Sequence, residues 1–128
     1  MPESSYPDDL LYHPEHDWAR IEGDVATFGI TWCAQDQLGE VVFFEPPDTG
    51  TATTKGEPYS EVESVKAVSD VVAPLSGEVI ERNQTLSDRP EAINEDPYGE
   101  GWMVKVRLSD PGEREQLLDA EAYRASLE

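Results

Sequence analysis

The chain has 128 residues, and 38% of them are hydrophobic, which suffices for one modest core and predicts a single domain over residues 1–128. Its 28 acidic and 9 basic side chains give a formal charge of -19, so neither nucleic acid nor a membrane is an expected partner. An acidic surface favours a monomer that meets larger proteins briefly. The first residues show no signal or transit peptide, and the single cysteine, Cys33, suits a reducing compartment, so we expect a cytoplasmic protein.

Short runs of Val, Ile, Phe and Thr between Gly, Pro, Asn and Asp predict a mainly β fold of short strands joined by turns. The expected strands cover residues 18–21, 25–30, 40–45, 59–65, 71–80 and 102–108. Gly23 is expected to form the turn between the first two strands. Thr31 is expected to cap a short connecting helix over residues 32–38, which Gly39 ends.

Two stretches, residues 46–56 and 83–101, are rich in turn formers and are predicted to be loops. The second loop is expected to pack Trp102 into the barrel. Residues 113–127 contain no Gly or Pro, and their apolar side chains recur at helical intervals. We therefore predict one C-terminal helix that packs against the sheet. These apolar side chains are Leu117, Leu118, Ala122 and Ala125.

Lys66 lies between two of the expected strands and is therefore predicted at or near the tip of a hairpin. Its neighbours Val65 and Ala67 are small or β-branched, so such a tip presents one amine without crowding. A lysine at a turn is ordinarily a solvated charge. The residues alone leave open whether Lys66 is only such a charge or a site of modification.

The stretch around this lysine, EVESVKAVSDVVAPLSGEV, resembles the modification hairpin of biotinyl and lipoyl carrier domains. Biotinyl carriers typically place a methionine on each side of the lysine, whereas Val65 and Ala67 flank it here, which resembles the lipoyl pattern. Other stretches resemble the glycine cleavage H-protein family, namely YHPEHDW, FGIT, AQDQLGEVVFFEPP, INEDPYGEGW and LLDAEAY. The likeness runs in order from about Tyr12 to the C-terminus, so residues 1–11 are expected to be an N-terminal extension.

This resemblance implies a β-sandwich or flattened barrel of the lipoyl (hybrid barrel) type, with a short connecting helix and a C-terminal helix. It implies lipoate bound covalently to Lys66, on a non-catalytic shuttle that moves an aminomethyl group from glycine decarboxylase (P protein) to the aminomethyltransferase (T protein). Dihydrolipoamide dehydrogenase (L protein) would reoxidise the arm. A lipoate ligase, or an octanoyltransferase with lipoyl synthase, would attach it. The lysine is then a tether, and the cofactor supplies the chemistry.

The resemblance also implies roles for carboxylates near the hairpin. Glu63 would help lipoylation enzymes recognise it. Asp70, together with an acidic loop that contains Glu15 and Asp17, would hold the loaded arm, because an aminomethyl nitrogen is cationic and carboxylates bind such a group. The family commonly has glutamate where Asp17 stands. From the residues alone, Glu61, Glu63 and Asp70 serve equally well merely to keep the hairpin solvated.

No metal or catalytic site is expected. His13 and His16 share one loop with no other clustered nitrogen or sulfur ligand, which fits metal binding poorly. Cys33 has no evident base partner, and no Ser, His and Asp motif is present. Two other functions stay open: an H-protein-like lipoate carrier that serves lipoyl relay or sulfur metabolism, and a small hydrolase that uses paired carboxylates such as Glu15 and Asp17.

Overall fold

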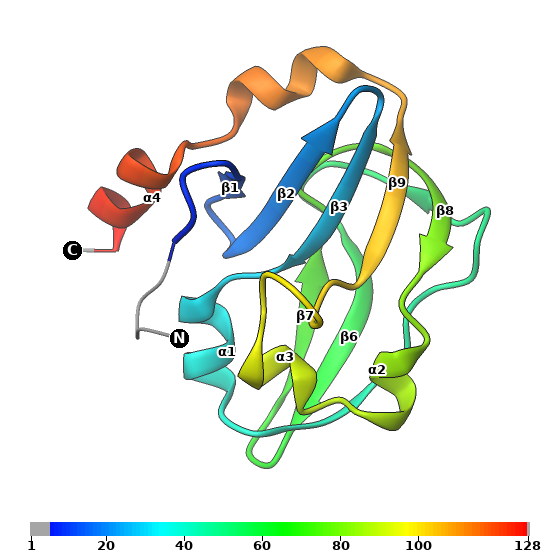
Figure 1. Ribbon diagram of the computed structural model, residues 1–128, viewed down its shortest axis with the longest axis vertical. Coiled ribbons are helices and arrows are strands. Elements are labelled where there is room, and N and C mark those ends of the chain that lie inside the picture. Colours follow the sequence, from blue (N-terminus) through cyan, green and yellow to red (C-terminus); the bar gives the residue numbers. More distant parts are fainter. Residues whose placement is uncertain (1–5, 128) are drawn as a thin grey trace.

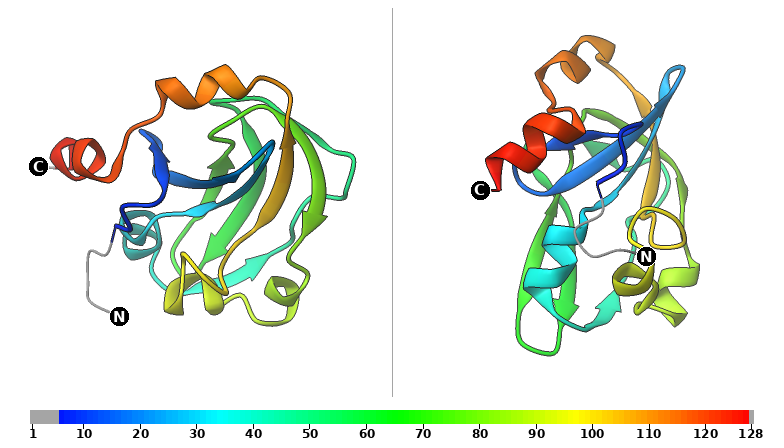
Figure 2. Two further views of the ribbon diagram at one scale, coloured as in Figure 1. Left: turned by 45° about the horizontal axis from the view of Figure 1, so that its top comes forward. Right: turned by 60° about the vertical axis from the view of Figure 1, so that its left-hand side comes forward.

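The computed structural model describes residues 6–127, in which antiparallel strands form two sheets (Figure 1). The six-stranded sheet consists, in spatial order, of β1 (Leu11–His13), β2 (Asp17–Glu22), β3 (Val25–Ile30), β9 (Val104–Leu108), β8 (Gly77–Arg82) and β5 (Ala52–Thr53). The three-stranded sheet consists of β4 (Val41–Phe44), β6 (Pro58–Ser64) and β7 (Val68–Val72). The larger sheet is strongly curled, and the hairpin of β6 and β7 extends beyond it at one end of the molecule (Figure 2).

The predicted hairpin of β2 and β3 is confirmed. The two strands pair along their whole length, and Gly23 in the turn has a φ of +67°, which glycine adopts without a steric penalty. Trp18 lies opposite Gly29, where a Cβ atom would lie 2.6 Å from the indole ring. Gly29 therefore makes room for Trp18, whose side chain is fully buried.

The predicted connecting helix, α1 (Trp32–Leu38), is also confirmed, with both of its expected ends. The Thr31 side chain accepts a hydrogen bond from the Ala34 backbone N–H at 3.2 Å, which satisfies one of the free donors of the first turn. Gly39 ends the helix with a φ of 79° and a ψ of −158°, a conformation that essentially only glycine occupies. Ala34 and Leu38 face the core.

The prediction of one strand over residues 71–80 is wrong. β7 ends at Val72 and belongs to the small sheet, whereas β8 begins at Gly77 and belongs to the large one. Pro74 lies in the crossover, where its missing N–H cannot support a continuous ladder. The buried Ala73 and Leu75 fill the core between the sheets, so their apolar character reflects the crossover and not a longer strand.

The loop predicted over residues 83–101 contains two short helices, α2 (Thr85–Asp88) and α3 (Ala92–Glu95). The expectation that this loop packs Trp102 into the barrel is met only in part: Trp102 packs against the buried cluster that contains Tyr12, Trp18 and Tyr98. Trp102 is only half-buried and lies beside Lys105, whose ammonium group is 5.5 Å from the centre of the Trp102 ring. Met103 takes the buried place instead, with no exposed surface.

The single C-terminal helix is likewise not observed as predicted. A 3-10 helix, η1 (Pro111–Gln116), ends in extended backbone at Leu117, and α4 (Ala120–Ser126) begins after its cap Asp119. The Asp119 side chain accepts a hydrogen bond from the Ala122 N–H at 2.8 Å, which starts a new helix in place of a continuous one. Tyr123 is the buried anchor of α4, whereas Ala122 is exposed.

Three clusters of buried side chains form the core, and one of them joins both ends of the described chain. In that cluster the Tyr12 and Tyr123 rings stack with their centroids 4.8 Å apart. Tyr6 and Leu10, which belong to the expected extension of residues 1–11, are buried in the same cluster, and residues 1–5 lie outside the described part. None of the described helices is long and apolar enough to cross a membrane.

Candidate functional site

Lys66 lies at the tip of the β6–β7 hairpin. Ser64 closes the turn, because its backbone N–H donates to the Ala67 carbonyl at 2.8 Å and its hydroxyl accepts from the Ala67 N–H at 3.1 Å. The tip is therefore shorter than predicted, and Asp70 belongs to β7. Of the three lysines in the sequence, only Lys66 is exposed, since Lys55 and Lys105 are half-buried.

The hairpin tip is attached to the end of α1. The Val65 backbone N–H donates to the Glu40 carbonyl at 3.0 Å, which ties the turn to the segment that follows the helix. The Lys66 side chain lies over Gly39, where a Cβ atom would be 3.4 Å from Cε. Figure 2 shows α1 and the hairpin side by side. These contacts hold the backbone around Lys66 while leaving its amine in solvent.

A cleft of about 320 Å³ opens between β7 on one side and the start of β2 and α1 on the other. One part of its wall is apolar and consists of Ile30, Ala34, Leu38, Val62, Ala67 and Val68. The polar part consists of Glu15, His16, Asp17, Gln37, Ser69 and Asp70. The cleft begins at Ala67, the neighbour of Lys66, so it lies beside the base of the lysine side chain. The tertiary structure thus brings together the three carboxylates that the resemblance associates with the arm.

Asp17 differs from the expected loop position. It is the first residue of β2, and its side chain is turned inward with 2% of its surface exposed, because the strand pairing begins at this residue. One carboxylate oxygen, Oδ2, is buried without a hydrogen-bond partner among the described residues. Burial, followed by the charge of Glu15, raises the pKa of Asp17 well above its ordinary value, while a hydrogen bond from the Val72 backbone opposes that shift. Glu15 itself is exposed.

His16 connects this cleft to the C-terminal helix, a role that sequence reasoning missed. It is the one non-glycine residue between Tyr6 and Leu127 with a positive φ, 74°. Its Nδ1 atom lies 2.7 Å from the hydroxyl oxygen of Tyr123, which in turn lies 2.9 Å from Thr31 Oγ1. Backbone strain of this kind costs about 1–3 kcal/mol and persists where surrounding contacts enforce it. Tyr123 therefore helps to set the backbone between Glu15 and Asp17.

The other histidine of the segment also has a protein partner. His13 is buried, and its Nδ1 atom accepts a hydrogen bond from the Glu15 backbone N–H at 3.1 Å. Burial, followed by the charge of Lys55, lowers the pKa of His13. Both histidines thus shape the backbone that carries Glu15 and Asp17.

Glu63 lies on the outer face of the small sheet, one residue before Ser64. It pairs across the strands with Phe43 of β4 on one side and Val68 of β7 on the other. Its side chain is half-buried between these two exposed apolar residues. No clue in a single strand predicts this arrangement, because it depends on the register of three strands.

A lysine-tipped hairpin in a small sheet, packed beneath a curled larger sheet, defines a carrier domain of the biotinyl and lipoyl type. Residues 10–128 match the family model described as "Glycine cleavage H-protein". The chain belongs to the glycine cleavage H-protein family. This membership confirms the predicted function, a lipoyl-carrying shuttle of the glycine cleavage system.

Individual relatives agree with the family assignment over nearly the whole chain. The glycine cleavage system H protein of Trichormus variabilis is 51% identical over 128 residues, which are 100% of this chain and 98% of the relative. That of Rubrobacter xylanophilus is 56% identical over 122 residues, which are 95% of this chain and 94% of the relative. The crystal structure of a glycine cleavage system H protein from Mycobacterium marinum matches with a TM-score of 0.86 and 39% identity, covering 94% of this chain and 98% of that one. The predicted fold class is thereby confirmed.

Proposed function

We propose that Lys66 is the lipoyl attachment point and that the chain is a non-catalytic, monomeric carrier of the cytoplasm. The observation that carries this proposal is the placement of the one exposed lysine at a fixed hairpin tip, beside a cleft lined by Asp17, whose buried Oδ2 atom has no hydrogen-bond partner among the described residues. Its partners are glycine decarboxylase, the aminomethyltransferase and dihydrolipoamide dehydrogenase. A lipoate ligase, or an octanoyltransferase with lipoyl synthase, provides the modification.

Attachment requires that the lysine nitrogen reach an activated acyl group. In the ligase route this nitrogen attacks the carbonyl carbon of a lipoyl adenylate, an amide forms, AMP leaves, and the proton of the amine passes to a base of the ligase. Lys66 suits this reaction because its amine is exposed and the turn below it is closed by Ser64. Lys105, by contrast, rests on the Trp102 ring.

The cleft fits a lipoyl group both in chemistry and in size. Its volume of about 320 Å³ lies within the range of sites that bind small organic groups, and its apolar wall suits an alkyl chain. When bound, the lipoyl group supplies a disulfide that accepts and releases the aminomethyl cargo at sulfur. Asp17 lines this cleft, and its buried Oδ2 atom has no hydrogen-bond partner among the described residues, so an ammonium group that reached it would satisfy it.

The acidic residues of the cleft then act on the cargo. Asp17 accepts a hydrogen bond from the cationic nitrogen of the aminomethyl group, and such a charge-assisted bond contributes about 1.5–3 kcal/mol when desolvated. Glu15 and Asp70 are exposed and add attraction that water and salt weaken. His16, held by Tyr123, fixes the segment between Glu15 and Asp17. Excluding water from the cargo slows its hydrolysis.

Glu63 serves a different step in this proposal, namely recognition by the lipoylation enzymes. Its place on the outer face, three residues before Lys66, is away from the buried carboxylate of Asp17. A carboxylate there offers a basic residue of the enzyme a partner close to the lysine that it modifies.

The decisive experiment compares Lys66→Arg with Lys105→Arg as a matched control. Each apo protein is incubated with lipoate ligase, ATP and lipoate, its mass is measured, and glycine-dependent release of carbon dioxide is then assayed with the three partner enzymes. We expect the lipoyl mass increment and turnover in wild type and Lys105→Arg and neither in Lys66→Arg, because a guanidinium group does not form the amide. All three proteins should unfold at the same temperature.

Lipoylation or turnover of Lys66→Arg would move the attachment point to another residue. A lipoylated wild-type protein that supports no release of carbon dioxide would instead favour a carrier for lipoyl relay or sulfur metabolism.

A further inference from the structure

Exposed apolar side chains gather on the small sheet that carries Lys66. Among residues 6–127, five large hydrophobic residues are exposed, and four of these lie on this sheet or at its hairpin tip: Val42, Phe43, Val65 and Val68. Single exposed hydrophobic residues are common, but a cluster marks a binding surface. Phe43 is the largest of them, with 54% of its surface exposed.

Strand register aligns two of these residues in a row with a carboxylate. Phe43 on β4 pairs with Glu63 on β6, and Glu63 pairs with Val68 on β7. Paired residues of antiparallel strands point to the same face, so the three side chains form a continuous row directly below the hairpin tip. The row thus combines two apolar side chains with one acidic side chain.

The outer face is hollowed next to this row. A depression of about 470 Å³ is lined by Phe43 and by the carboxylates of Glu45, Glu61 and Asp70. Glu61 and Asp70 pair across β6 and β7, and neither has an ion-pair partner within the described part of the chain. The charge of this face therefore complements a basic surface.

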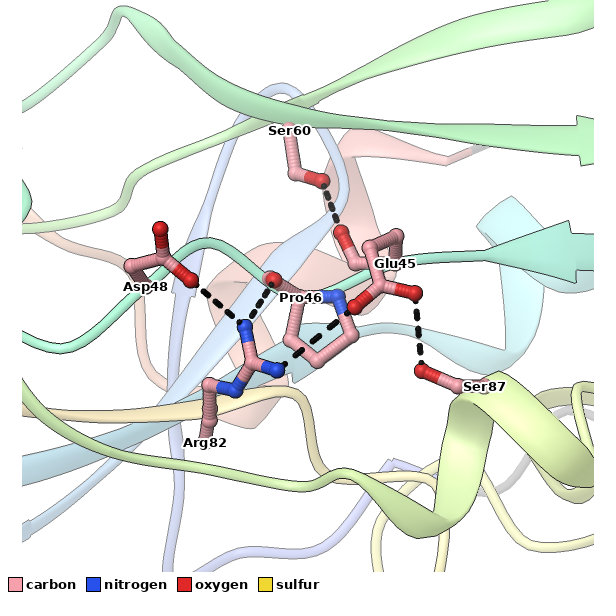
Figure 3. Close-up of polar contacts among 6 residues, drawn as sticks. All are labelled: Glu45, Pro46, Asp48, Ser60, Arg82 and Ser87. Carbon is pink, nitrogen blue, oxygen red and sulfur yellow. Dashed lines mark hydrogen bonds and ion pairs between the residues drawn. The ribbon is translucent and has the colours of Figure 1, made fainter.

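Phe43 lies on a strand whose end is firmly held (Figure 3). Arg82 of β8 donates to the Pro46 carbonyl at 3.1 Å and to the Asp48 carboxylate at 3.0 Å, and it lies 3.6 Å from the Glu45 carboxylate. The Ser60 hydroxyl donates to the Glu45 carbonyl at 3.1 Å. These contacts fix the backbone that follows Phe44, so binding at Phe43 requires little further ordering of the strand that carries it.

We propose that this outer face, centred on Phe43, is the docking surface for the enzyme that acylates Lys66, and that the enzyme offers an apolar pocket bordered by basic side chains. The proposal rests on acylation of Lys66. An enzyme that acylates the bare amine must approach within one lysine side chain of the hairpin, and neighbouring strands are only about 5 Å apart. Enzymes that act on the end of an attached lipoyl arm work farther from the hairpin, so their binding depends less on contacts with this face.

The test measures acylation of apo protein by purified lipoate ligase with ATP and lipoate, at varied concentrations of the carrier. Phe43→Ala is compared with wild type, with the conservative variant Phe43→Leu and with Leu127→Ala, which removes an exposed apolar side chain at the residue that follows α4. We expect KM to rise about tenfold in Phe43→Ala with kcat unchanged, to rise less in Phe43→Leu and to stay constant in Leu127→Ala. Higher salt should raise the wild-type KM.

Binding and turnover provide independent readouts. Calorimetry with ligase that holds a non-reactive acyl-adenylate analogue should show the same tenfold loss in affinity for Phe43→Ala. Fully lipoylated Phe43→Ala should support glycine decarboxylase with an unchanged KM. An unchanged ligase KM, an equal loss in Leu127→Ala, or a defect confined to the decarboxylase would overturn the proposal. Failure of the wild-type protein to be acylated at Lys66 would instead overturn the proposed function on which it rests.

Discussion

Replacing Asp17 with asparagine is expected to stabilise the unmodified protein at pH 8 and to weaken the hold of its cleft on an amine. Asp17 is 2% exposed, and its Oδ2 atom has no hydrogen-bond partner among the described residues. Asparagine removes the buried charge and the repulsion from Glu15, yet its carbonyl can still accept the hydrogen bond from the Val72 backbone. An isosteric change should therefore relieve an unfavourable interaction without opening a cavity.

The magnitude follows from the cost of a buried, unsatisfied polar group, which is about 1–3 kcal/mol. Because the asparagine amide is itself incompletely paired, we expect a gain of about 1–2 kcal/mol in the free energy of unfolding at pH 8. For a domain of this size, that gain corresponds to roughly 3–8 °C in Tm. It is large enough to be measured by urea unfolding that is followed through tryptophan fluorescence.

The gain should depend on pH in one direction only. The folded-state pKa of Asp17 is raised above its unfolded value of 3.8, so the folded protein retains a proton that the unfolded chain releases. The stability that this retained proton contributes is fully present below pH 3.8 and is lost as the pH rises through the folded-state pKa. The advantage of Asp17→Asn is therefore smallest below pH 3.8, grows as the pH rises towards the folded-state pKa, and is constant above it.

The control is Asp70→Asn, which neutralises an exposed carboxylate of the same cleft and should change the free energy of unfolding at pH 8 by less than about 0.5 kcal/mol. Lower stability of Asp17→Asn at pH 8, or an advantage that does not grow as the pH rises above 3.8, would refute the reasoning.

Three further predictions concern the cleft and the hairpin. The double variant Asp17→Asn with Asp70→Asn should be lipoylated normally but should release formaldehyde from the isolated, loaded protein several-fold faster than wild type at matched salt and pH; equal half-lives would leave these acids with no protective role. Tyr123→Phe should lower the free energy of unfolding by about 1–2 kcal/mol, since it loses hydrogen bonds of 2.7 and 2.9 Å, and should also speed that release. Loss of stability with unchanged release would assign Tyr123 a structural role alone. Glu63→Ala should slow lipoylation in timed assays while shifting Tm little, and matched time courses would make Glu63 only a solvated charge.

Local interactions made a large part of the fold predictable from the sequence. The turn at Gly23 and the helix between Thr31 and Gly39 were found because backbone conformation and capping depend on residues only a few positions apart. Lys66 at a hairpin tip followed from the strand patterns on either side of it, and the motifs in order along the chain indicated the family. The C-terminal segment was predicted less well, because the Asp119 cap interrupts a pattern that otherwise fits one helix.

The tertiary structure decided what surrounds the lysine. Local patterns could not show that the chain crosses between sheets around Pro74, because an apolar run is compatible with one long strand or with two strands joined through the core. Nor could they show that Asp17 is buried, or that His16 meets Tyr123, which is 107 positions away in the sequence. Strand register and the packing of the chain's two ends bring these groups together, so the cleft exists only in the folded protein.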